Sequence, residues 1–178
     1  MTSKSIKRTA LIESLANELI DHELFSDNVK RDKDTEKQIQ KSLFLRMEKT
    51  GLQKVLTENL DMKSDKIKEV IKKDFAWEQD INTTVNQISM FATQHRPDAI
   101  LKVNDLTIAI EIKKGKDGSS IRSGIGQSII YSKNYDFVIF VYVDISEGRN
   151  IKNSVTATKE QEVINELWEN YNVKFVVV

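Results

Sequence analysis

The segment from Asp136 to Ile145 constrains the fold more than any other part of this 178-residue chain. Between its two aspartates it consists only of Phe, Val, Ile and Tyr. A strand with one face in water alternates apolar and polar residues, whereas an unbroken apolar run is typical of a strand buried on both faces. The sequence therefore predicts that this segment is the central strand of a sheet.

Helical and extended patterns alternate around that strand. Apolar residues at helical spacing predict helices over four segments: 5–25, 35–51, 121–134 and 158–171. Runs of apolar and β-branched residues predict further strands in four segments: 75–85, 97–103, 106–113 and 173–178. Thr35 and Gln38 form a capping-box pattern, and Gly51 marks the expected end of the second helix. The order helix, three strands, helix, strand, helix, strand indicates an α/β fold.

The length suits one domain with a hydrophobic core and is too short to promise two. We therefore expect residues 1–178 to form a single domain. Residues 1–34 are expected to be an N-terminal helical extension. Residues 52–73 mix Leu, Val and Ile with many lysines, which favours a helical insertion of one or two short helices.

The composition limits which metal this chain could bind. It has no cysteine, which excludes disulfides, Cys-ligated zinc, iron–sulfur clusters and thiol catalysis. Its two histidines, His22 and His95, leave little for a zinc site. Any metal would have oxygen ligands, which points to Mg²⁺ or Mn²⁺. The 27 basic and 27 acidic residues balance, so the chain lacks the net positive charge of a protein that only coats DNA, which argues mildly against that class.

No segment has the pattern of a membrane span or a signal peptide. The longest apolar stretch, around 137–143, is far shorter than the roughly 20 residues that cross a bilayer. Glu13, Asn17 and Glu18 interrupt the apolar region that a signal peptide would need near the start. We therefore expect a cytoplasmic protein without membrane contact.

A predicted β-hairpin places two carboxylates and a lysine on one face of the sheet. With a two-residue loop at 104–105, the register puts Asp98 opposite Glu111. Lys113 follows Glu111 at a spacing of two, so it lies on the same face. The isoleucines that alternate with these residues point to the other face: Ile108, Ile110 and Ile112.

This combination of side chains is suited to phosphodiester hydrolysis. Two carboxylates about 5 Å apart at their Cβ atoms repel each other, and a hard divalent cation between them relieves the repulsion. Such a cation can polarise a phosphodiester oxygen and activate a water, while a lysine orients or deprotonates that water. A lone Glu-x-Lys triplet usually decorates a solvated strand face. Here the preceding Pro97-Asp98, the apolar alternation and the register all agree, which favours a site.

Pro97-Asp98 followed by Glu111-Ile112-Lys113 resembles the PD-(D/E)XK motif of the restriction-endonuclease-like nuclease superfamily, over roughly residues 35–146. The resemblance implies a three-layer α/β/α core of order αβββαβ around a central mixed sheet. It also implies that Asp98 and Glu111 bind Mg²⁺, for which Mn²⁺ can substitute. Ile112 would lend its backbone carbonyl to the metal, and Lys113 would serve the attacking water.

Further positions match elaborations found in parts of that superfamily. Gln127 and Tyr131 lie one helical turn apart and can face the carboxylates together, although a polar helix surface would look the same. Glu36 is the first candidate for an additional metal ligand from the first core helix, and Glu48 is the second. A glutamate that only complements the helix dipole is the alternative for Glu36.

Basic residues flank the motif on both sides. Lys114, Lys116 and Arg122 follow it on a glycine-rich loop and could contact substrate phosphates, and Arg96 precedes it. A solvated charged loop explains these residues equally well. His95 fits a local hydrogen bond better than a metal ligand.

The leading hypothesis is a Mg²⁺-dependent endonuclease that cuts DNA, expected to act as a homodimer. One alternative is a catalytically inactive nucleic-acid-binding or regulatory module of the same fold, and another is an RNA-directed nuclease. A third is a helical scaffold whose first 75 residues recruit partners. The sequence leaves open the target, the strand preference and the choice between internal and terminal bonds.

Overall fold

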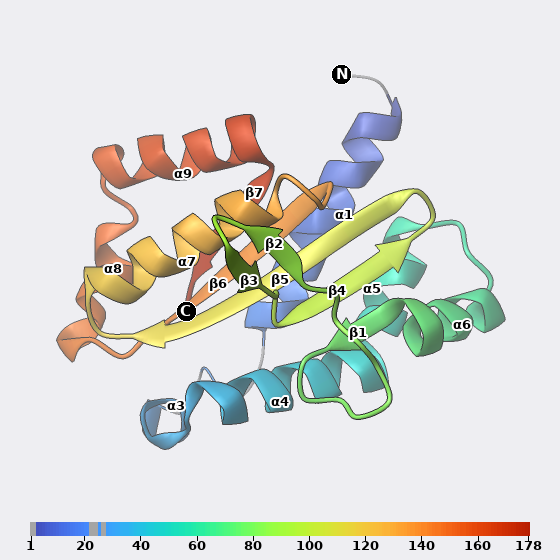
Figure 1. Ribbon diagram of the computed structural model, residues 1–178, viewed down its shortest axis with the longest axis horizontal. Coiled ribbons are helices and arrows are strands. Elements are labelled where there is room, and N and C mark those ends of the chain that lie inside the picture. Colours follow the sequence, from blue (N-terminus) through green and yellow to red (C-terminus); the bar gives the residue numbers. More distant parts are fainter. Residues whose placement is uncertain (1–2, 22–24, 26–27) are drawn as a thin grey trace.

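Five strands pair into one mixed sheet in the order β1-β4-β5-β6-β7 (Figure 1). Their bounds are β1 Phe75–Trp77, β4 Ala99–Val103, β5 Leu106–Gly115, β6 Phe137–Asp144 and β7 Val173–Val177. β1, β4 and β5 are antiparallel neighbours, and β5, β6 and β7 run parallel. β6 lies between β5 and β7 and is buried from Val138 onward, which confirms the predicted central strand. This computed structural model describes residues 3–21, 25 and 28–178.

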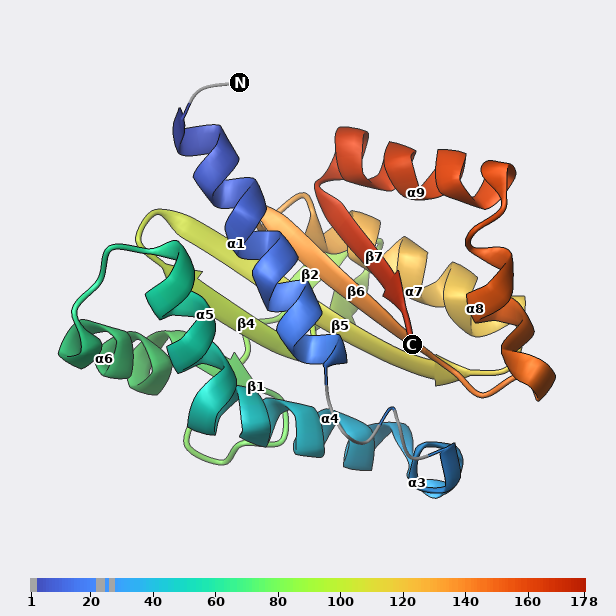
Figure 2. The same ribbon diagram turned by 180° about the vertical axis from the view of Figure 1, so that it is seen from behind.

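Helices cover both faces of the sheet (Figure 2). On one face lie α1 Ser3–Ile20, α4 Glu36–Arg46, α5 Leu52–Asn59 and α6 Ser64–Asp74. On the other face lie α7 Gly118–Tyr131, α8 Asn150–Ser154 and α9 Thr158–Tyr171. A short helix, α3 Asn28–Lys33, precedes α4, and a 3₁₀ turn at Glu147–Arg149 precedes α8. None of the described helices is long and apolar enough to cross a bilayer.

The helix predicted from Thr158 to Tyr171 is observed with those bounds. α7 starts three residues before the predicted position because the Asp117 side chain accepts a hydrogen bond from Ser119 N and caps the helix there. α1 ends at Ile20, earlier than expected. His22 and most of the predicted helix end near residue 25 lie outside the described residues.

The first helix is part of the core and is not an appendage. Its residues Leu11, Ile12, Leu15, Ala16 and Leu19 are fully buried, in the same cluster as the isoleucines of β5. α1 packs on α5 and on β6 and β7. α1, which falls within the predicted extension 1–34, thus contributes a large share of the packing on this face. Residues 52–73 form α5 and most of α6, as the helical pattern predicted.

The capping box that was predicted at the start of α4 is confirmed. Thr35 Oγ1 accepts from Gln38 N at 3.3 Å, and Gln38 Oε1 accepts from Thr35 N at 2.8 Å. The prediction that Gly51 ends this helix is wrong. Gly51 has helical angles, φ −62° and ψ −48°, and the chain continues through a π-helical turn, Met47–Gly51, into α5.

Close packing explains the glycine at position 51. A Cβ atom at this position would lie 2.8 Å from Met47 Sδ and 3.1 Å from Glu18 Cγ. Glycine therefore lets α1 approach the turn, and the sequence pattern confused this packing role with a helix terminator.

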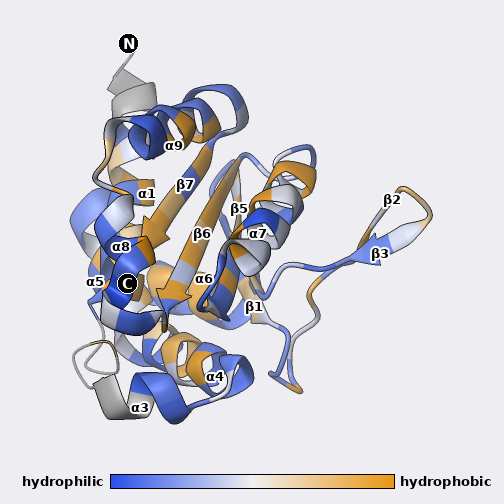
Figure 3. Ribbon diagram, turned by 90° about the vertical axis from the view of Figure 1, so that its left-hand side faces the viewer, coloured by the Kyte–Doolittle hydropathy of each residue, from blue (hydrophilic) through white to orange (hydrophobic). Residues whose placement is uncertain are grey.

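Residues 78–98 depart most from the sequence-based expectation. The strand predicted within 75–85 ends at Trp77, and a separate antiparallel hairpin follows, made of β2 Ile88–Met90 and β3 Thr93–His95. Figure 3 shows this hairpin reaching out from the side of the sheet. The sequence pattern did not reveal it.

Candidate active site

The β4–β5 hairpin has the predicted register. Val103 pairs with Leu106, and the ladder runs back to Ala99 opposite Ile110. The next position along both strands therefore brings Asp98 opposite Glu111. The alternating isoleucines enter the core beneath α1, while Ala109 belongs to the cluster on the α7 side. Glu111 and Lys113 share the alternation of Ala109, so both lie on the face that α7 covers.

Asp98 and Glu111 are both buried at this point. Asp98 is 6% exposed, and its Oδ2 accepts a hydrogen bond from Ile112 N at 2.7 Å. Glu111 is 1% exposed, and its Oε1 lies 2.8 Å from Lys113 Nζ. Its other oxygen, Oε2, is buried and makes no hydrogen bond of standard geometry among the described residues, although the Tyr131 side chain lies close enough to the carboxylate to lower the pKa of Glu111. A buried carboxylate oxygen without a donor is costly, so this atom is suited to receive a ligand.

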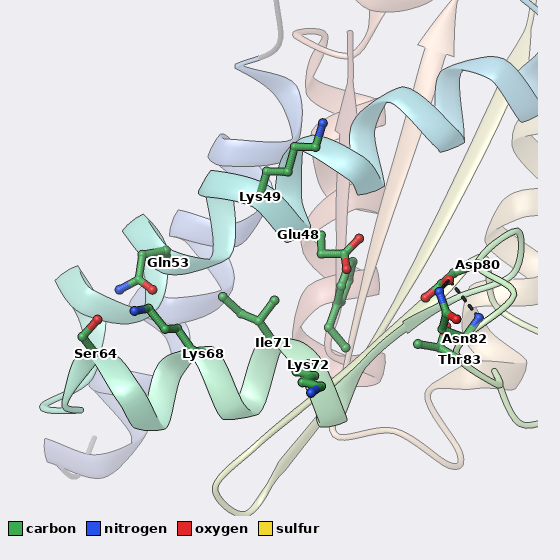
Figure 4. A pocket seen from close by; sticks show the side chains of 11 residues that line it. Glu48, Lys49, Gln53, Ser64, Lys68, Ile71, Lys72, Asp80, Asn82 and Thr83 are labelled. Carbon is green, nitrogen blue, oxygen red and sulfur yellow. Dashed lines mark hydrogen bonds between the residues drawn. The ribbon is translucent and has the colours of Figure 1, made fainter.

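Glu36 reaches the same site from α4. Its Oε1 lies 3.8 Å from Lys113 Nζ, and its Oε2 accepts from Lys114 N at 2.8 Å. The Thr35 cap fixes Glu36 at the first helical position, which points the side chain toward the end of β5. Glu48, the second candidate, lies at the far end of the helix and lines a different cleft with Lys68 and Lys72 (Figure 4). Of the two glutamates, the structure brings only Glu36 to the carboxylates.

Burial and mutual repulsion shape the electrostatics of the pair. Burial raises the pKa of Asp98 well above its usual range, and the nearby charge of Glu111 raises it further. Burial also raises the pKa of Glu111, and the attraction of Lys113 does not cancel this effect. For Lys113, burial pulls the pKa down, but the attraction of Glu111 and Asp98 outweighs burial and leaves it raised. Three carboxyl groups, Asp98, Glu111 and Glu36, thus share one lysine ammonium, and a further cation would favour their charged forms.

Two polar residues of α7, Gln127 and Tyr131, were predicted to face the carboxylates. Tyr131 is fully buried, and its hydroxyl donates to the backbone carbonyl of Arg96 at 2.9 Å. Burial and the neighbouring charge of Glu111 raise the pKa of Tyr131, so it stays a neutral donor. Gln127 lies one turn earlier, and its Oε1 is buried without a partner among the described side chains and backbone groups. The structure therefore brings Tyr131 to Glu111, and it places Gln127 one turn earlier on the same helix.

Gln40 is a residue that sequence reasoning missed. It is 4% exposed on α4, one turn after Glu36, and its Nε2 donates to the Ile112 carbonyl at 3.4 Å. Gln79 in turn donates to Gln40 Oε1 at 3.3 Å. This chain of amides holds the carbonyl that the motif assigns to the metal. The available signal was a glutamine next to Ile39 in the buried stripe of the helix.

The basic residues differ from expectation. The Lys114 ammonium donates to two backbone carbonyls, Asp32 O at 2.9 Å and Asp34 O at 2.5 Å. These bonds tie the end of β5 to the start of α4, which argues against the predicted phosphate contact. The Arg96 guanidinium pairs with Glu78, and this pairing also diverts it from the site. Lys116 and Arg122 are exposed, as a contact with substrate would require. His95 makes a local contact with Met90 O at 3.3 Å, as expected.

The residues at this site fit a hard cation such as Mg²⁺. No group of three or more His, Asp or Glu side chains in the described part of the chain is arranged as a metal cage. Mg²⁺, however, is usually held by one or two carboxylates with waters and substrate phosphates. The buried pair and the Glu111 Oε2 that makes no hydrogen bond of standard geometry meet that requirement.

Comparison with known proteins leaves these roles to be argued from the geometry alone. No protein-family model, curated protein or solved structure matches this chain.

Proposed function

We propose that this chain is a Mg²⁺-dependent nuclease of the restriction-endonuclease-like, PD-(D/E)XK class that hydrolyses DNA phosphodiester bonds. The observation that carries the proposal is the buried Asp98–Glu111 pair, which has raised pKa values and a lysine on the same carboxylate. A chain gains nothing in stability from burying two carboxylates side by side. The pair is therefore best explained by a ligand of opposite charge.

The helices on both faces of a mixed sheet are consistent with the three-layer core of that class. The order α4, β1, β4, β5, α7, β6 follows its αβββαβ pattern, with α5 and α6 inserted before β1 and the β2–β3 hairpin inserted before β4. This agreement in element order supports the assignment, together with the motif.

Asp98 and Glu111 would hold the cation, with the Ile112 carbonyl and Glu36 at the border of the site. Mg²⁺ bound there would polarise a phosphodiester oxygen and supply an activated water. Asp98 is fixed by the Ile112 amide, so one of its oxygens stays oriented while the other is open to a ligand. Gln40 keeps the Ile112 carbonyl in place from the opposite side.

Lys113 provides the positive charge next to the scissile bond. Its ammonium donates to Glu111 Oε1 and can donate as well to a water or a phosphate oxygen at the same carboxylate. The Tyr131 hydroxyl donates to the Arg96 carbonyl, and the Tyr131 side chain borders the site on the side of α7. Gln127 contributes an amide whose oxygen is free to orient the water, and Lys116 and Arg122 remain candidates for contacts with flanking phosphates.

The test compares metal binding and cleavage in the same set of variants. Supercoiled, linear, branched and single-stranded DNA are incubated with Mg²⁺ or Mn²⁺, and Mn²⁺ binding is measured separately by electron paramagnetic resonance. We expect Glu111→Gln and Asp98→Asn to lose Mn²⁺ binding and at least about 100-fold in cleavage, since the metal supplies several kcal/mol. Lys113→Met should lose cleavage but keep Mn²⁺ binding.

Glu36→Gln in the first turn of α4 and Glu48→Gln in the π-helical turn after it form a matched pair. The first should weaken Mn²⁺ binding and cleavage, and the second should leave both unchanged because Glu48 lies in another cleft. Cleavage that is indifferent to Glu111→Gln would overturn the proposal. DNA binding without Mn²⁺ binding or cleavage would instead identify a non-catalytic binding module.

A further inference from the structure

The β2–β3 hairpin is the part of the molecule that the proposed chemistry does not use. It pairs Ile88 with His95 and Met90 with Thr93, and it stands away from the rest of the fold (Figure 3). Two three-residue strands reach about 10 Å, roughly the depth of a DNA groove. Because this hairpin buries little of its own surface, it adds little to the stability of the fold, and a functional role would explain its presence.

The tip of the hairpin is strained and apolar. Phe91 and Ala92 both have positive φ values, 53° and 58°, which a two-residue hairpin loop usually assigns to Asn and Gly. The Phe91 side chain is 84% exposed. Thr93 Oγ1 donates to Met90 O at 3.0 Å and to Phe91 O at 3.2 Å, which holds the turn in this shape. An exposed aromatic residue at a strained position is costly and is typical of a functional site.

The base of the hairpin is anchored to the candidate active site. β3 leads through Arg96 and Pro97 directly to Asp98. The Tyr131 hydroxyl holds the Arg96 carbonyl, and Glu78 N donates to the Asp98 carbonyl at 2.9 Å. On the other side, three residues before β2 begins, Val85 packs in a small buried cluster with Ala76 and Ile100. The tip is therefore held at a fixed position relative to the carboxylates.

The chemistry of the segment favours a nucleic acid as its ligand. Residues 81–97 contain no Asp or Glu, although the chain has 27 acidic residues. The polar side chains on the two strands are uncharged hydroxyls and amides, with His95 next to the base. Such a surface does not repel phosphates and can donate hydrogen bonds to them.

We propose that the β2–β3 hairpin is a wedge that inserts Phe91 between stacked bases of duplex DNA bound at the Asp98–Glu111 site. Apolar side chains that enter a groove in this way unstack a base step and kink the duplex. The inference rests on the proposed nuclease function and adds how the enzyme engages and deforms its substrate. Deformation at the wedge would favour duplex sites that are already easy to open, such as mismatches, branches or flexible steps.

The test uses a duplex with 2-aminopurine placed in turn at each position, whose fluorescence rises when the base is unstacked. Ca²⁺ replaces Mg²⁺ so that binding is measured without cleavage. We expect the full-length protein to raise the fluorescence at one or two adjacent positions. Phe91→Ala should abolish the rise and weaken duplex binding about 5- to 100-fold, the range for one lost stacking contact. Mn²⁺ binding should not change.

Two further variants separate a wedge from a merely structural tip. Replacing Phe91→Asn together with Ala92→Gly supplies the residues that this turn prefers, so it should raise the melting temperature while it weakens DNA binding. Val163→Ala, on α9, removes another exposed apolar side chain and should leave DNA binding unchanged.

Wild-type protein that cuts duplex DNA, with Phe91→Ala equal to it in binding and fluorescence, would overturn the wedge and leave the nuclease proposal standing. Wild-type protein that neither binds nor cuts DNA would overturn both. A Phe91→Ala variant that changes the sedimentation mass but not DNA binding would show that the tip contacts a second copy, which also overturns the wedge.

Discussion

Gly124 is the point at which α7 touches the sheet, and it offers a sharp test of how the site is positioned. A Cβ atom here would lie 2.2 Å from Phe140 Cζ and 2.5 Å from Cε2, whereas ordinary contact begins near 3.4 Å. Either the ring on β6 or the whole helix must therefore move by more than about 1 Å. Phe140 is fully buried and stacked on Phe175, with ring centroids 4.9 Å apart, so the ring has little room to move. We expect the helix to shift, and with it Tyr131.

The magnitude follows from this geometry. Overpacking of this kind lowers the free energy of unfolding by about 1–3 kcal/mol. In a domain of this size each kcal/mol lowers the melting temperature by about 2–4 °C. A displacement of about 1 Å at a catalytic site can cost about 100-fold in rate. Gly124→Ala should therefore lower the melting temperature and also reduce Mg²⁺-dependent cleavage.

Gly126→Ala is the matched control in the same helix. No atom lies within 4 Å of a Cβ at this position, so the substitution gains helix propensity and should stabilise by about 1 kcal/mol. The assay is thermal unfolding of both variants, followed by cleavage of plasmid DNA. If Gly124→Ala melts and cuts like Gly126→Ala, the close approach of α7 does not position the site and the reasoning is refuted.

Two further predictions concern the buried polar groups. Burial raises the pKa of Asp98 and of Glu111, so the folded state binds protons more tightly than the unfolded chain. Burying the two charged carboxylates lowers the free energy of unfolding, and this loss is complete at a pH above the folded pKa values. The loss disappears as the pH falls through the folded pKa values toward the ordinary values, 3.8 for Asp98 and 4.5 for Glu111. In EDTA, Asp98→Asn should therefore be more stable than wild type at about pH 8, with the gap closing at lower pH; a constant gap in melting temperature would contradict this. Gln40→Leu should weaken Mn²⁺ binding about 10-fold because the Ile112 carbonyl loses its donor. Gln53→Leu, at a half-buried glutamine of α5 away from the carboxylates, is its control, and equal Mn²⁺ titrations of the two would count against the role of Gln40.

Local chemistry explains why the site hairpin could be predicted from sequence. The two-residue loop at 104–105 fixes the register, and a period of two then decides which face each side chain takes. Asn104 adopts a positive φ of 54°, as such a loop requires, and asparagine tolerates it. The capping box at Thr35 is equally local, and it determines where Glu36 points. Asp98, Glu111 and Lys113 could therefore be placed together by local rules alone.

Contacts between distant segments could not be predicted in this way. Gly51 looks like a helix terminator until α1 is seen to pack against it. Gln40 looks like a surface residue until the Ile112 carbonyl, 72 positions later, is found beside it. Lys114 looks free for substrate, but its partners belong to the segment before α4. The Mg²⁺, the DNA substrate and the homodimer stay predictions, because no contact in the described chain tests them.

The β2–β3 hairpin was missed for the opposite reason, since its local signal is misleading. A two-residue turn normally shows Asn-Gly or a similar pair, but here it holds Phe91 and Ala92. Pattern analysis reads such residues as part of a strand or a buried segment. A turn that contradicts its own propensity is where sequence reasoning is expected to fail, and such failures concentrate at functional positions.

The chain also shows how it treats a buried carboxylate that has a structural role. Glu18 is 5% exposed, and its two oxygens are paired with Arg46 at 2.6 Å and Lys54 at 2.9 Å. Asp144 is fully buried, and its oxygens accept from two backbone amides, Ser146 N and Lys152 N. Glu111 is buried as deeply, yet one of its oxygens has no partner among the described groups. Because the same fold pairs both oxygens of Glu18 and of Asp144, the unpaired oxygen of Glu111 argues for a ligand and not for poor packing.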